Sequence, residues 1–211
     1  MSRVGYSALV STSTAPTVDT ATRVLDIAEE LVQRRGYNGF SYADIATEIG
    51  TTKAALHYHF ANKAALGDAL IVRYTDRFQA ALDGIDRRKR TPPDKLRAYA
   101  DLYRDVLRDR RMCLCGMLAA EFDTLPPSMR TAIVAFFDHN EAWLSRVLDA
   151  GRGDGSIAFA GPVRDTARLV ISALEGAVLV SRTYAGLARF RQVADQLLAL
   201  LMTPAVAAKT P

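Results

Sequence analysis

Residues 40–66 read FSYADIATEIGTTKAALHYHFANKAAL, in which two short helical segments meet at Gly50. Ser41 precedes the first segment and Asp44 follows it three residues on, which is the spacing of a capping box at a helix N-terminus. A glycine between the segments allows the left-handed backbone of a tight turn between helices. The inward-facing positions that would fix the angle between the two helices are Ile45, Ala46, Ile49 and Leu56. The stretch predicts a helix-turn-helix whose second helix can lie in a DNA major groove.

The rest of the chain is patterned as helix too. Apolar residues recur at helical spacing almost everywhere, and no segment alternates for long as a half-buried strand does. Gly36 stops the first helix, and a charged run followed by Pro92 and Pro93 indicates a loop over residues 86–93. The expected class is all-α, with about nine helices over residues 19–35, 41–50, 51–60, 62–82, 94–108, 113–124, 128–150, 162–185 and 187–202. Residues 1–18 and 203–211 are expected to be a disordered arm and a disordered tail.

Composition limits the class of protein less sharply. The chain has 211 residues, a net charge of +4 and a pI near 9.2, which suit an anionic partner such as DNA but do not separate DNA from RNA or a membrane surface. The longest apolar stretch, residues 169–180, is interrupted by Glu175 and is too short to span a membrane. Cys113 and Cys115 are too close in sequence to join distant parts of a fold. We expect a cytoplasmic protein with reduced thiols.

The motif over residues 40–66 resembles the signature of the TetR/AcrR family of transcriptional repressors. The resemblance rests on the turn glycine, the run Thr52-Lys53-Ala54-Ala55-Leu56, the aromatic cluster of residues 57–60, and Asn62-Lys63 followed by Leu66. It implies a nine-helix fold with a DNA-binding head at residues 19–66 and an effector-binding and dimerisation domain at residues 67–202. It also implies a homodimer that binds a palindromic operator and is released by a small-molecule effector, with no catalytic residues, no cofactor and no metal.

The predicted DNA contacts are Ser41, Tyr42, Thr52, Lys53, Ala54, Ala55, His57, Tyr58 and Lys63. Hydroxyls at helix N-termini, as at Ser41 and Thr52, suit phosphate oxygens, and the small alanines let the helix approach the base edges. Lys63, in the first turn of the next helix, is expected to add a phosphate contact. His57 stands where the family most often has tyrosine, so a contact there could depend on protonation. Taken singly, each position could instead be solvated surface, and Tyr58 could be core.

The resemblance implies an effector pocket between the helices that follow the head. Its candidate residues are Tyr99, Tyr103, Cys113, Phe122, Phe137, Asn140 and Trp143. Such pockets are lined by apolar groups with a few polar anchors. The alternative is that most of these aromatic residues belong to the ordinary core.

The two cysteines open a second possibility. Cys113 and Cys115 lie in a Cys-Leu-x-Gly opening that resembles one branch of the family, some of whose members sense electrophiles or oxidants. A thiol at a helix N-terminus close to Arg110 and Arg111 is expected to have a lowered pKa, which favours reaction at Cys113. Inert buried cysteines are the alternative.

The last two helices resemble a dimer interface. Apolar residues repeat at helical spacing in both, and a strip of small residues near Gly176 permits close helix crossing. Two such helices from each subunit would make a four-helix bundle. The predicted interface residues are Val170, Leu174, Gly176, Val178, Val193 and Leu197. A two-fold dimer would place two recognition helices on one face of the DNA.

Two other classes of protein compete with a regulator. An all-α enzyme would need a catalytic set, and the sequence contains no Ser-His-Asp set, no metal-spaced His/Cys cluster and no phosphate-binding glycine loop. A dimeric ligand-binding or scaffold protein that had lost DNA binding would not need the intact turn at Gly50 or Lys63. The expected function is therefore a dimeric transcriptional regulator, with a thiol-based sensor acting through Cys113 as the alternative.

Overall fold

The computed structural model describes residues 19–184 and 187–202, and it confirms the all-α fold predicted from the sequence. The described residues form nine α-helices, one short 3-10 helix and one isolated β-bridge, between Ile157 and Met202. The α-helices are α1 (Thr20–Arg35), α2 (Tyr42–Ile49), α3 (Lys53–His59), α4 (Lys63–Arg88), α5 (Pro92–Arg108), α6 (Leu114–Ala120), α7 (Pro127–Gly153), α8 (Val163–Arg182) and α9 (Leu187–Leu201). The predicted disordered segments, residues 1–18 and 203–211, lie outside the described residues.

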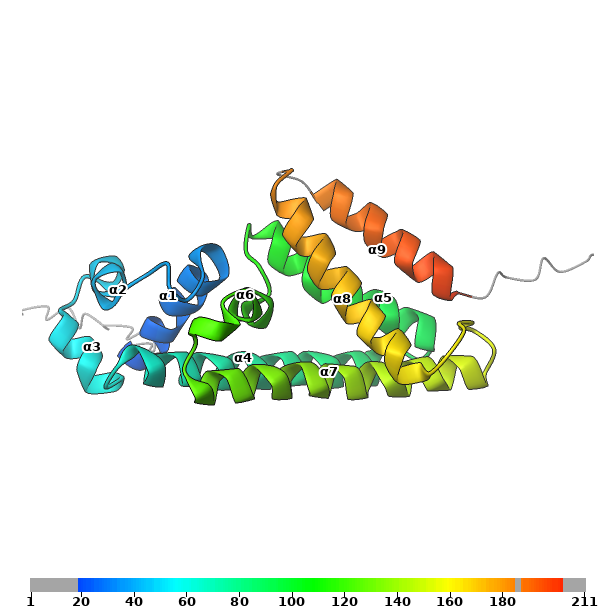
Figure 1. Ribbon diagram of the computed structural model, residues 1–211, viewed down its shortest axis with the longest axis horizontal. Coiled ribbons are helices and arrows are strands. Elements are labelled where there is room, and N and C mark those ends of the chain that lie inside the picture. The colour runs from blue at the N-terminus through cyan, green and yellow to red at the C-terminus, as the bar shows by residue number, and fades with distance from the viewer. Residues whose placement is uncertain (1–18, 185–186, 203–211) are drawn as a thin grey trace, which may run out of the picture.

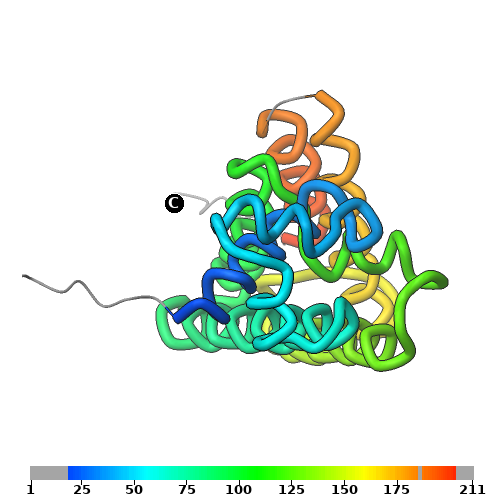
Figure 2. Tube along the Cα trace, turned by 90° about the vertical axis from the view of Figure 1, so that its left-hand side faces the viewer, coloured from blue at the N-terminus to red at the C-terminus, as the bar shows by residue number. Residues whose placement is uncertain are grey.

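The helices α1, α2 and α3 form a head at one end of an elongated body. The long helices α4 and α7 run side by side away from this head, and α8 and α9 pack on each other above α7 (Figures 1 and 2). Helix α5 fills the space between α7, α8 and α9. The short helix α6 contacts α1 of the head as well as α4 and α7 of the body. It therefore joins the head to the body.

Two glycines shape the head in the way the sequence predicts. Gly50 ends α2 with φ 74° and ψ 42°, and its N–H donates to the Ala46 carbonyl at 3.0 Å. Gly36 ends α1 with φ 84°, and a Cβ there would lie 2.7 Å from Glu121 Oε1. Both positions have a left-handed φ that a side chain would strain, and Gly36 also admits a close neighbour.

The predicted loop over residues 86–93 is wrong in extent. Helix α4 continues to Arg88 instead of ending near Leu82, and α5 begins at Pro92, which leaves only residues 89–91 between them. Proline is tolerated in the first turn of a helix because the N–H that it lacks would have no partner there. Thr91 caps α5 by accepting from the Asp94 N–H at 3.3 Å. The charged run stays helical because its side chains can point to solvent.

Two more helix ends differ from expectation. The helix expected over residues 113–124 is divided, since α6 ends at Ala120 and the 3-10 helix covers Phe122–Thr124. Helix α7 continues past Ala150, where it was expected to end, through Gly151 to Gly153. Gly151 is buried, and a Cβ there would collide with the side chain of Ile157. The close approach of Ile157 accounts for a glycine inside this helix.

The head and the body share one continuous core. The aromatic side chains of Tyr99, Tyr103, Phe136 and Phe190 are among its largest fully buried members. Ion pairs also join the two parts, since Arg73 of α4 bonds Asp26 of α1 at 2.7 Å and Glu29 of α1 at 2.8 Å. The position of the head therefore depends on helices of the body.

Candidate functional site

The α2–α3 unit is held together from the inside, which leaves the outer face of α3 uncovered. Ile45 and Leu56 are buried between the helices, and Ala46 is small enough to allow their approach. Along the outer face, Thr52, Lys53, Ala54, His57 and Tyr58 are exposed. Tyr58 is 86% exposed, which is unusual for an aromatic side chain and excludes the core alternative for it. Most of the predicted contact residues thus share one accessible face.

The two helix N-termini in this unit differ in what they offer to a phosphate. Thr52 caps α3, where its Oγ1 accepts from the Ala55 N–H at 3.2 Å. At the start of α2, the Ser41 N–H and hydroxyl both donate to the Asp44 carboxylate, each at 2.7 Å. The Asp44 charge therefore already occupies the N-terminus of α2. The N-terminus of α3 has no such carboxylate in its first turn.

Tyr42 supports His57 from behind this face. The Tyr42 ring is buried, its hydroxyl donates to the Phe60 carbonyl at 2.9 Å, and its centroid lies 4.7 Å from that of His57. His57 Nδ1 lies 3.0 Å from the Ala61 carbonyl oxygen. Because a carbonyl only accepts, Nδ1 carries the proton in this bond. Tyr42 is thus placed as a supporting residue instead of the DNA contact predicted for it.

Lys63, predicted as a phosphate contact, has partners within the protein. Its ammonium donates to the Phe40 carbonyl and lies 4.6 Å and 4.3 Å from the ring centroids of Tyr37 and Phe40. Partial burial lowers the pKa of this ammonium. Lys63 therefore fastens the start of α4 to the segment between α1 and α2. Sequence reasoning missed this because a lysine in a first helical turn is usually solvated.

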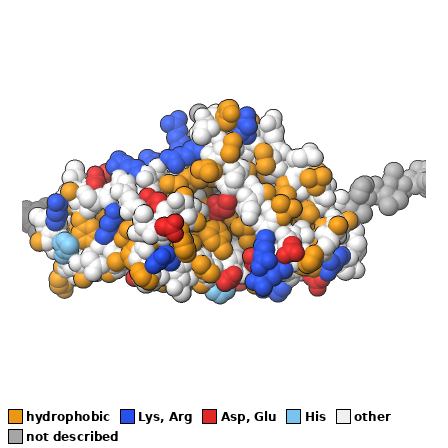
Figure 3. All heavy atoms as spheres, viewed as in Figure 1, with side chains coloured by type: hydrophobic (Ala, Val, Ile, Leu, Met, Phe, Trp, Pro, Cys, Tyr) orange, Lys and Arg blue, Asp and Glu red, His pale blue; other side chains and the backbone are white. Residues whose placement is uncertain are grey.

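A cavity of about 400 Å³ lies between the start of α6, α7 and α8. The surrounding face is largely hydrophobic in the space-filling view (Figure 3). The cavity is lined by Met112, Gly116, Met117, Ala119, Ala120, Phe137, Glu141, Arg168, Ile171, Ser172, Glu175, Gly176 and Leu179. Its volume falls in the range of small-molecule sites.

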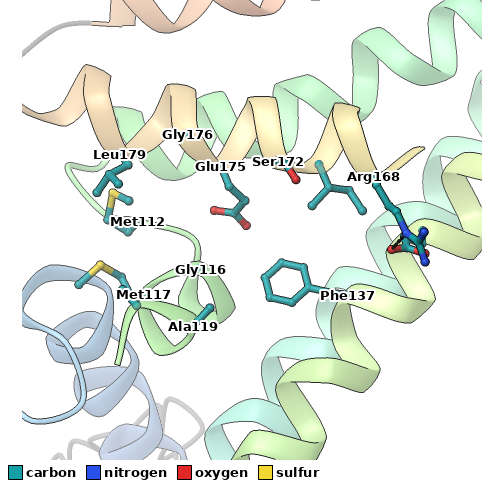
Figure 4. A pocket seen from close by; sticks show the side chains of 13 residues that line it. Met112, Gly116, Met117, Ala119, Phe137, Arg168, Ser172, Glu175, Gly176 and Leu179 are labelled. Atoms are coloured by element: carbon teal, nitrogen blue, oxygen red, sulfur yellow. Dashed lines mark hydrogen bonds and ion pairs between the residues drawn. The ribbon is translucent and has the colours of Figure 1, made fainter. Parts of the chain in front are cut away.

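Glu175 is a charged residue of the cavity lining that has no ion-pair partner among the described residues. Its side chain points from α8 toward Gly116 of α6 (Figure 4), where a Cβ would collide with Glu175 Oε2. Its Oε1 is shut off from solvent and has no hydrogen-bond partner among the described residues. Burial raises the pKa of Glu175 to about 7, although a hydrogen bond from the Cys113 thiol lowers it in part. The sequence signal for this residue was an acid that interrupts an otherwise apolar stretch.

Only part of the predicted pocket lines this cavity. Phe137 does, and Cys113 lies beside Glu175. Phe122 lines a different hollow with Arg130 and Thr131. The remaining four residues, Tyr99, Tyr103, Asn140 and Trp143, are buried in the core.

The polar groups of those four residues have partners within the protein, including Asp86, which accepts from the Trp143 indole at 2.9 Å. The Tyr99 hydroxyl donates to Asn140 Oδ1 at 3.1 Å and lies 3.2 Å from the Tyr103 hydroxyl. The Asn140 amide donates to the Phe136 carbonyl at 2.8 Å. Trp143 stacks on Tyr99 with centroids 5.6 Å apart. Because these groups are already paired, the core alternative describes them better than a ligand role.

The lowered thiol pKa predicted from the sequence is wrong. Cys113 and Cys115 are 1% and 0% exposed, and burial, with the nearby Glu175, raises both pKa values well above the usual range. Arg111 does not reach the thiols and instead pairs with Glu30 at 3.2 Å. The closeness of Arg111 to Cys113 in sequence therefore does not lower the pKa of the thiol.

The predicted dimer residues are divided between the inside and the outside of the subunit. Val170, Leu174 and Val178 are buried in its own core, whereas Gly176 and Val193 are exposed and Leu197 is partly buried. The outer faces of α8 and α9 carry Val193 together with three apolar residues that were not predicted: Leu169, Val180 and Leu200. Helical periodicity thus located mainly the buried faces of these helices, and only Gly176 and Val193 of the predicted set are exposed.

Helix α6 is tied to the head at both of its ends. Before it, the Met112 N–H donates to the Gln33 carbonyl at 3.1 Å. After it, the Glu121 carboxylate accepts from the backbone N–H groups of Tyr37 at 2.5 Å and Asn38 at 3.2 Å. The same helix lines the cavity, so the cavity wall and the head are joined by direct hydrogen bonds.

Family comparison accounts for both halves of the chain. Residues 24–70 match the model of bacterial regulatory proteins of the tetR family, and residues 92–206 match the tetracyclin repressor-like C-terminal domain. The chain belongs to the TetR family. It is thus a DNA-binding transcriptional regulator and not an enzyme, as the sequence predicts. In the described part of this TetR protein, no helix is long and apolar enough to cross a membrane.

Solved structures and a curated relative agree with this assignment. A TetR-family regulator from Agrobacterium tumefaciens superimposes with a TM-score of 0.84 at 30% identity, covering 87% of this chain and 97% of that one. A TetR regulator from Legionella pneumophila gives a TM-score of 0.81 at 31% identity, covering 89% of this chain and 100% of that one. The transcriptional repressor NemR of Escherichia coli K12 is 24% identical over 195 residues, 89% of this chain and 96% of NemR.

Proposed function

We propose that this TetR protein is a homodimeric repressor that binds a palindromic operator through α3 and is released by a small molecule in the α6–α7–α8 cavity. The observation that carries the proposal is the double role of α6, which lines the cavity and holds the head through Glu121. The proposed DNA contacts are Thr52, Lys53, Ala54, Ala55, His57 and Tyr58, which line the outer side of α3.

The DNA contacts divide into those that position the head and those that can read bases. The N-terminus of α3 at Thr52 and the Lys53 ammonium suit phosphates, which position the protein without reading sequence. Ala54 leaves room for the helix to approach base edges and can touch a thymine methyl. Tyr58 carries a phenol that can donate to the DNA backbone. An operator in the chromosome would place the protein in the cytoplasm.

The dimer is proposed to form through the outward apolar set of α8 and α9. Leu169, Val180 and Leu200 are 58%, 47% and 70% exposed, an arrangement that is costly for an isolated subunit in water. A two-fold axis through these helices would pair the outward faces of two subunits and set the distance between their heads. That distance would match half-sites about one helical turn of DNA apart or a multiple of it.

Release would act through the distance between the heads. The protein would have two states that differ in the position of α6. A ligand that contacts Gly116, Met117 and Ala119 favours the state with a displaced α6 if it binds that state more tightly. Because Glu121 caps the segment that joins α1 to α2, displacement of α6 turns the head. The thiol-sensor alternative has less support, because Cys113 and Cys115 are buried and their raised pKa values disfavour the reactive thiolate.

The test is selection of bound DNA from a random pool with the full-length protein, followed by fluorescence anisotropy on the recovered sequence. We expect a palindrome that is also found upstream of the protein's own gene. Tyr58→Ala should weaken binding at least tenfold, whereas Tyr184→Ala, which removes another exposed tyrosine that follows α8 and lies outside α3, should not. Recovery of no DNA sequence, or equal affinity for a scrambled palindrome, would contradict the proposal.

A further inference from the structure

We infer that the α6–α7–α8 cavity binds a hydrophobic amine, a compact and mainly apolar molecule whose protonated nitrogen pairs with the Glu175 carboxylate. The inference rests on the proposed function in taking the bound molecule to be the effector. It goes further by giving that molecule a chemical class.

The walls of the cavity select an apolar body. Met112, Met117, Phe137, Ile171 and Leu179 supply thioether, aromatic and aliphatic surface. Methionine side chains adapt to ligands of different shape, and an aromatic face such as that of Phe137 favours flat or cationic groups. A volume of about 400 Å³ accommodates a molecule with one or two fused rings, and excludes a large macrocycle.

The charge inside the cavity selects a cation. Three charged residues line it, and two of them neutralise each other because Arg168 Nε bonds Glu141 Oε1 at 3.0 Å. Glu141 also pairs with Arg164 at 2.9 Å, so its charge is fully compensated. The carboxylate of Glu175 has no such partner, and its Oε1 is buried and, among the described residues, unpaired. A buried oxygen of this kind gains most from a donor that carries positive charge.

The fold keeps space open in front of this carboxylate. Gly116 lies against its Oε2, so any side chain at that position would displace Glu175. Two small residues of α8 flank Glu175: Ser172 lies about one helical turn before it, and Gly176 follows it in sequence. A methyl group added at Gly176 would meet no neighbouring heavy atom within 4 Å. Figure 4 shows Glu175 between these small residues, with Phe137 across the cavity. An ammonium group can therefore approach the carboxylate without moving the backbone.

The titratable neighbours do not compete for this role. Apart from the Arg168–Glu141 pair, Glu175 acts on Tyr74 of α4, Tyr99 and Tyr103 of α5, Cys113 and Cys115, and burial raises their pKa values, so these five groups are neutral near pH 7. Glu175 itself is partly protonated there, because burial raises its pKa to about 7. A bound ammonium favours the carboxylate, so binding near or below pH 7 displaces the carboxyl proton into solvent.

The experiment uses the full-length protein without DNA and a matched series of probes. The amines are benzylamine, 2-phenylethylamine, 2-(1-naphthyl)ethylamine and 1-aminoadamantane, each compared by titration calorimetry at pH 7.5 with the alcohol that has a hydroxyl in place of the amino group. We expect at least one amine to bind tenfold or more tightly than its alcohol. Glu175→Gln should remove that preference and leave the affinity for the alcohol within about twofold.

A control and a proton count complete the test. Asp138→Asn removes the same charge from an exposed position on α7 outside the cavity lining and should keep the amine preference. Calorimetry in buffers of different ionisation enthalpy should show proton release that is larger at pH 6.5 than at pH 8 and absent in Glu175→Gln. Equal binding of amines and alcohols, failure of every amine to bind, or an unchanged preference in Glu175→Gln would overturn the inference.

These outcomes are independent of the proposed function. Amine binding is measured without DNA, so a protein that binds amines but no operator would contradict only the repressor proposal. A protein that binds its operator but discriminates against amines would contradict only the ligand class.

Discussion

The Glu121 carboxylate, at the end of α6, lies 2.5 Å from the backbone nitrogen of Tyr37, which follows α1. The two residues are 84 positions apart in sequence, so the contact joins the body to the head. The same carboxylate lies against Gly36, whose lack of a side chain leaves room for it. Any shift of α6 must therefore break this contact or move the head.

Glu121→Ala is expected to weaken the link between cavity and head. Loss of a charge-assisted acceptor leaves backbone N–H groups without partners and should lower the free energy of unfolding by about 1–3 kcal/mol. Urea denaturation measures this loss, and anisotropy measures whether an effector still lowers operator affinity. The control is Asp123→Ala, an exposed acid two residues on that should change neither. An unaltered effector response in Glu121→Ala would show that coupling takes another route.

Gly50→Ala tests the turn of the helix-turn-helix. The φ of 74° at Gly50 is unfavourable for alanine, so we expect a loss of about 1 kcal/mol in unfolding free energy and weaker operator binding. The loss comes from backbone strain alone, because no heavy atom lies within 4 Å of the added methyl. Gly153→Ala is the matched control, since its site is equally open and Gly153 lies within α7. There alanine should be neutral or stabilising, and equal effects at both sites would contradict the argument.

The fold followed from the sequence because its signals are local. The capping box at Ser41, the turn at Gly50 and the 3.6-residue periodicity each depend on residues a few positions apart. The end of α4 was misplaced because the charged run 86–90 is compatible with both a loop and an exposed helical surface. What decides between them is Thr91, which caps the proline-led α5 and leaves α4 free to continue.

The site was less predictable because it depends on contacts between distant residues. The apolar repeats of α8 and α9 mark both an internal and an external face, and the sequence does not say which faces another subunit. Tyr99 and Asn140 look like ligand anchors in sequence, but their polar atoms meet each other across 41 positions. Glu175 and Gly116 form a complementary pair that no spacing rule reveals, because it requires α6 and α8 to be placed first.

Lys53→Ala and Lys63→Ala are expected to differ in their effect on DNA binding. Lys53 is exposed on α3, so its loss should remove a phosphate contact and reduce the slope of log affinity against log salt by about 1. Lys63 is engaged with Phe40 and Tyr37, so its loss should lower the unfolding free energy and leave that slope unchanged. Anisotropy at several salt concentrations and urea denaturation give the two readouts. A reduced salt slope in Lys63→Ala would instead support a contact between Lys63 and a DNA phosphate.

Leu169→Glu tests the dimer proposed for α8 and α9. Its side chain is 58% exposed on the outer face of α8, so a charge there costs little in a monomer but is buried in the proposed interface. We expect monomers in light scattering at micromolar concentration, together with weaker operator binding. Val134→Glu places the same charge on an exposed site of α7 and should remain dimeric. A Leu169→Glu dimer of normal mass would place the interface elsewhere.

Glu175→Gln is expected to change how stability depends on pH. An acid whose pKa is raised to about 7 by burial holds more protons in the folded than in the unfolded protein between about pH 4.5 and 7. The contribution of Glu175 to the free energy of unfolding is therefore fully present at low pH and is lost as pH rises through that window. Above the window this contribution no longer changes with pH. The loss amounts to about 3 kcal/mol at most. Glu175→Gln should match the parent near pH 4.5 and exceed it at pH 8.

Urea denaturation at pH 5 and pH 8 measures this prediction, with Glu141→Gln as a control of opposite sign. Burial alone would raise the pKa of Glu141, but hydrogen bonds and charges from Arg164 and Arg168 outweigh it and lower the pKa. Its stabilisation is thus present at neutral pH and lost as pH falls through the lowered pKa, so Glu141→Gln should be less stable than the parent at pH 8. If Glu175→Gln also proved less stable at pH 8, the carboxylate would already have a favourable partner within the protein itself. The Glu175 oxygen would then no longer favour a cationic ligand.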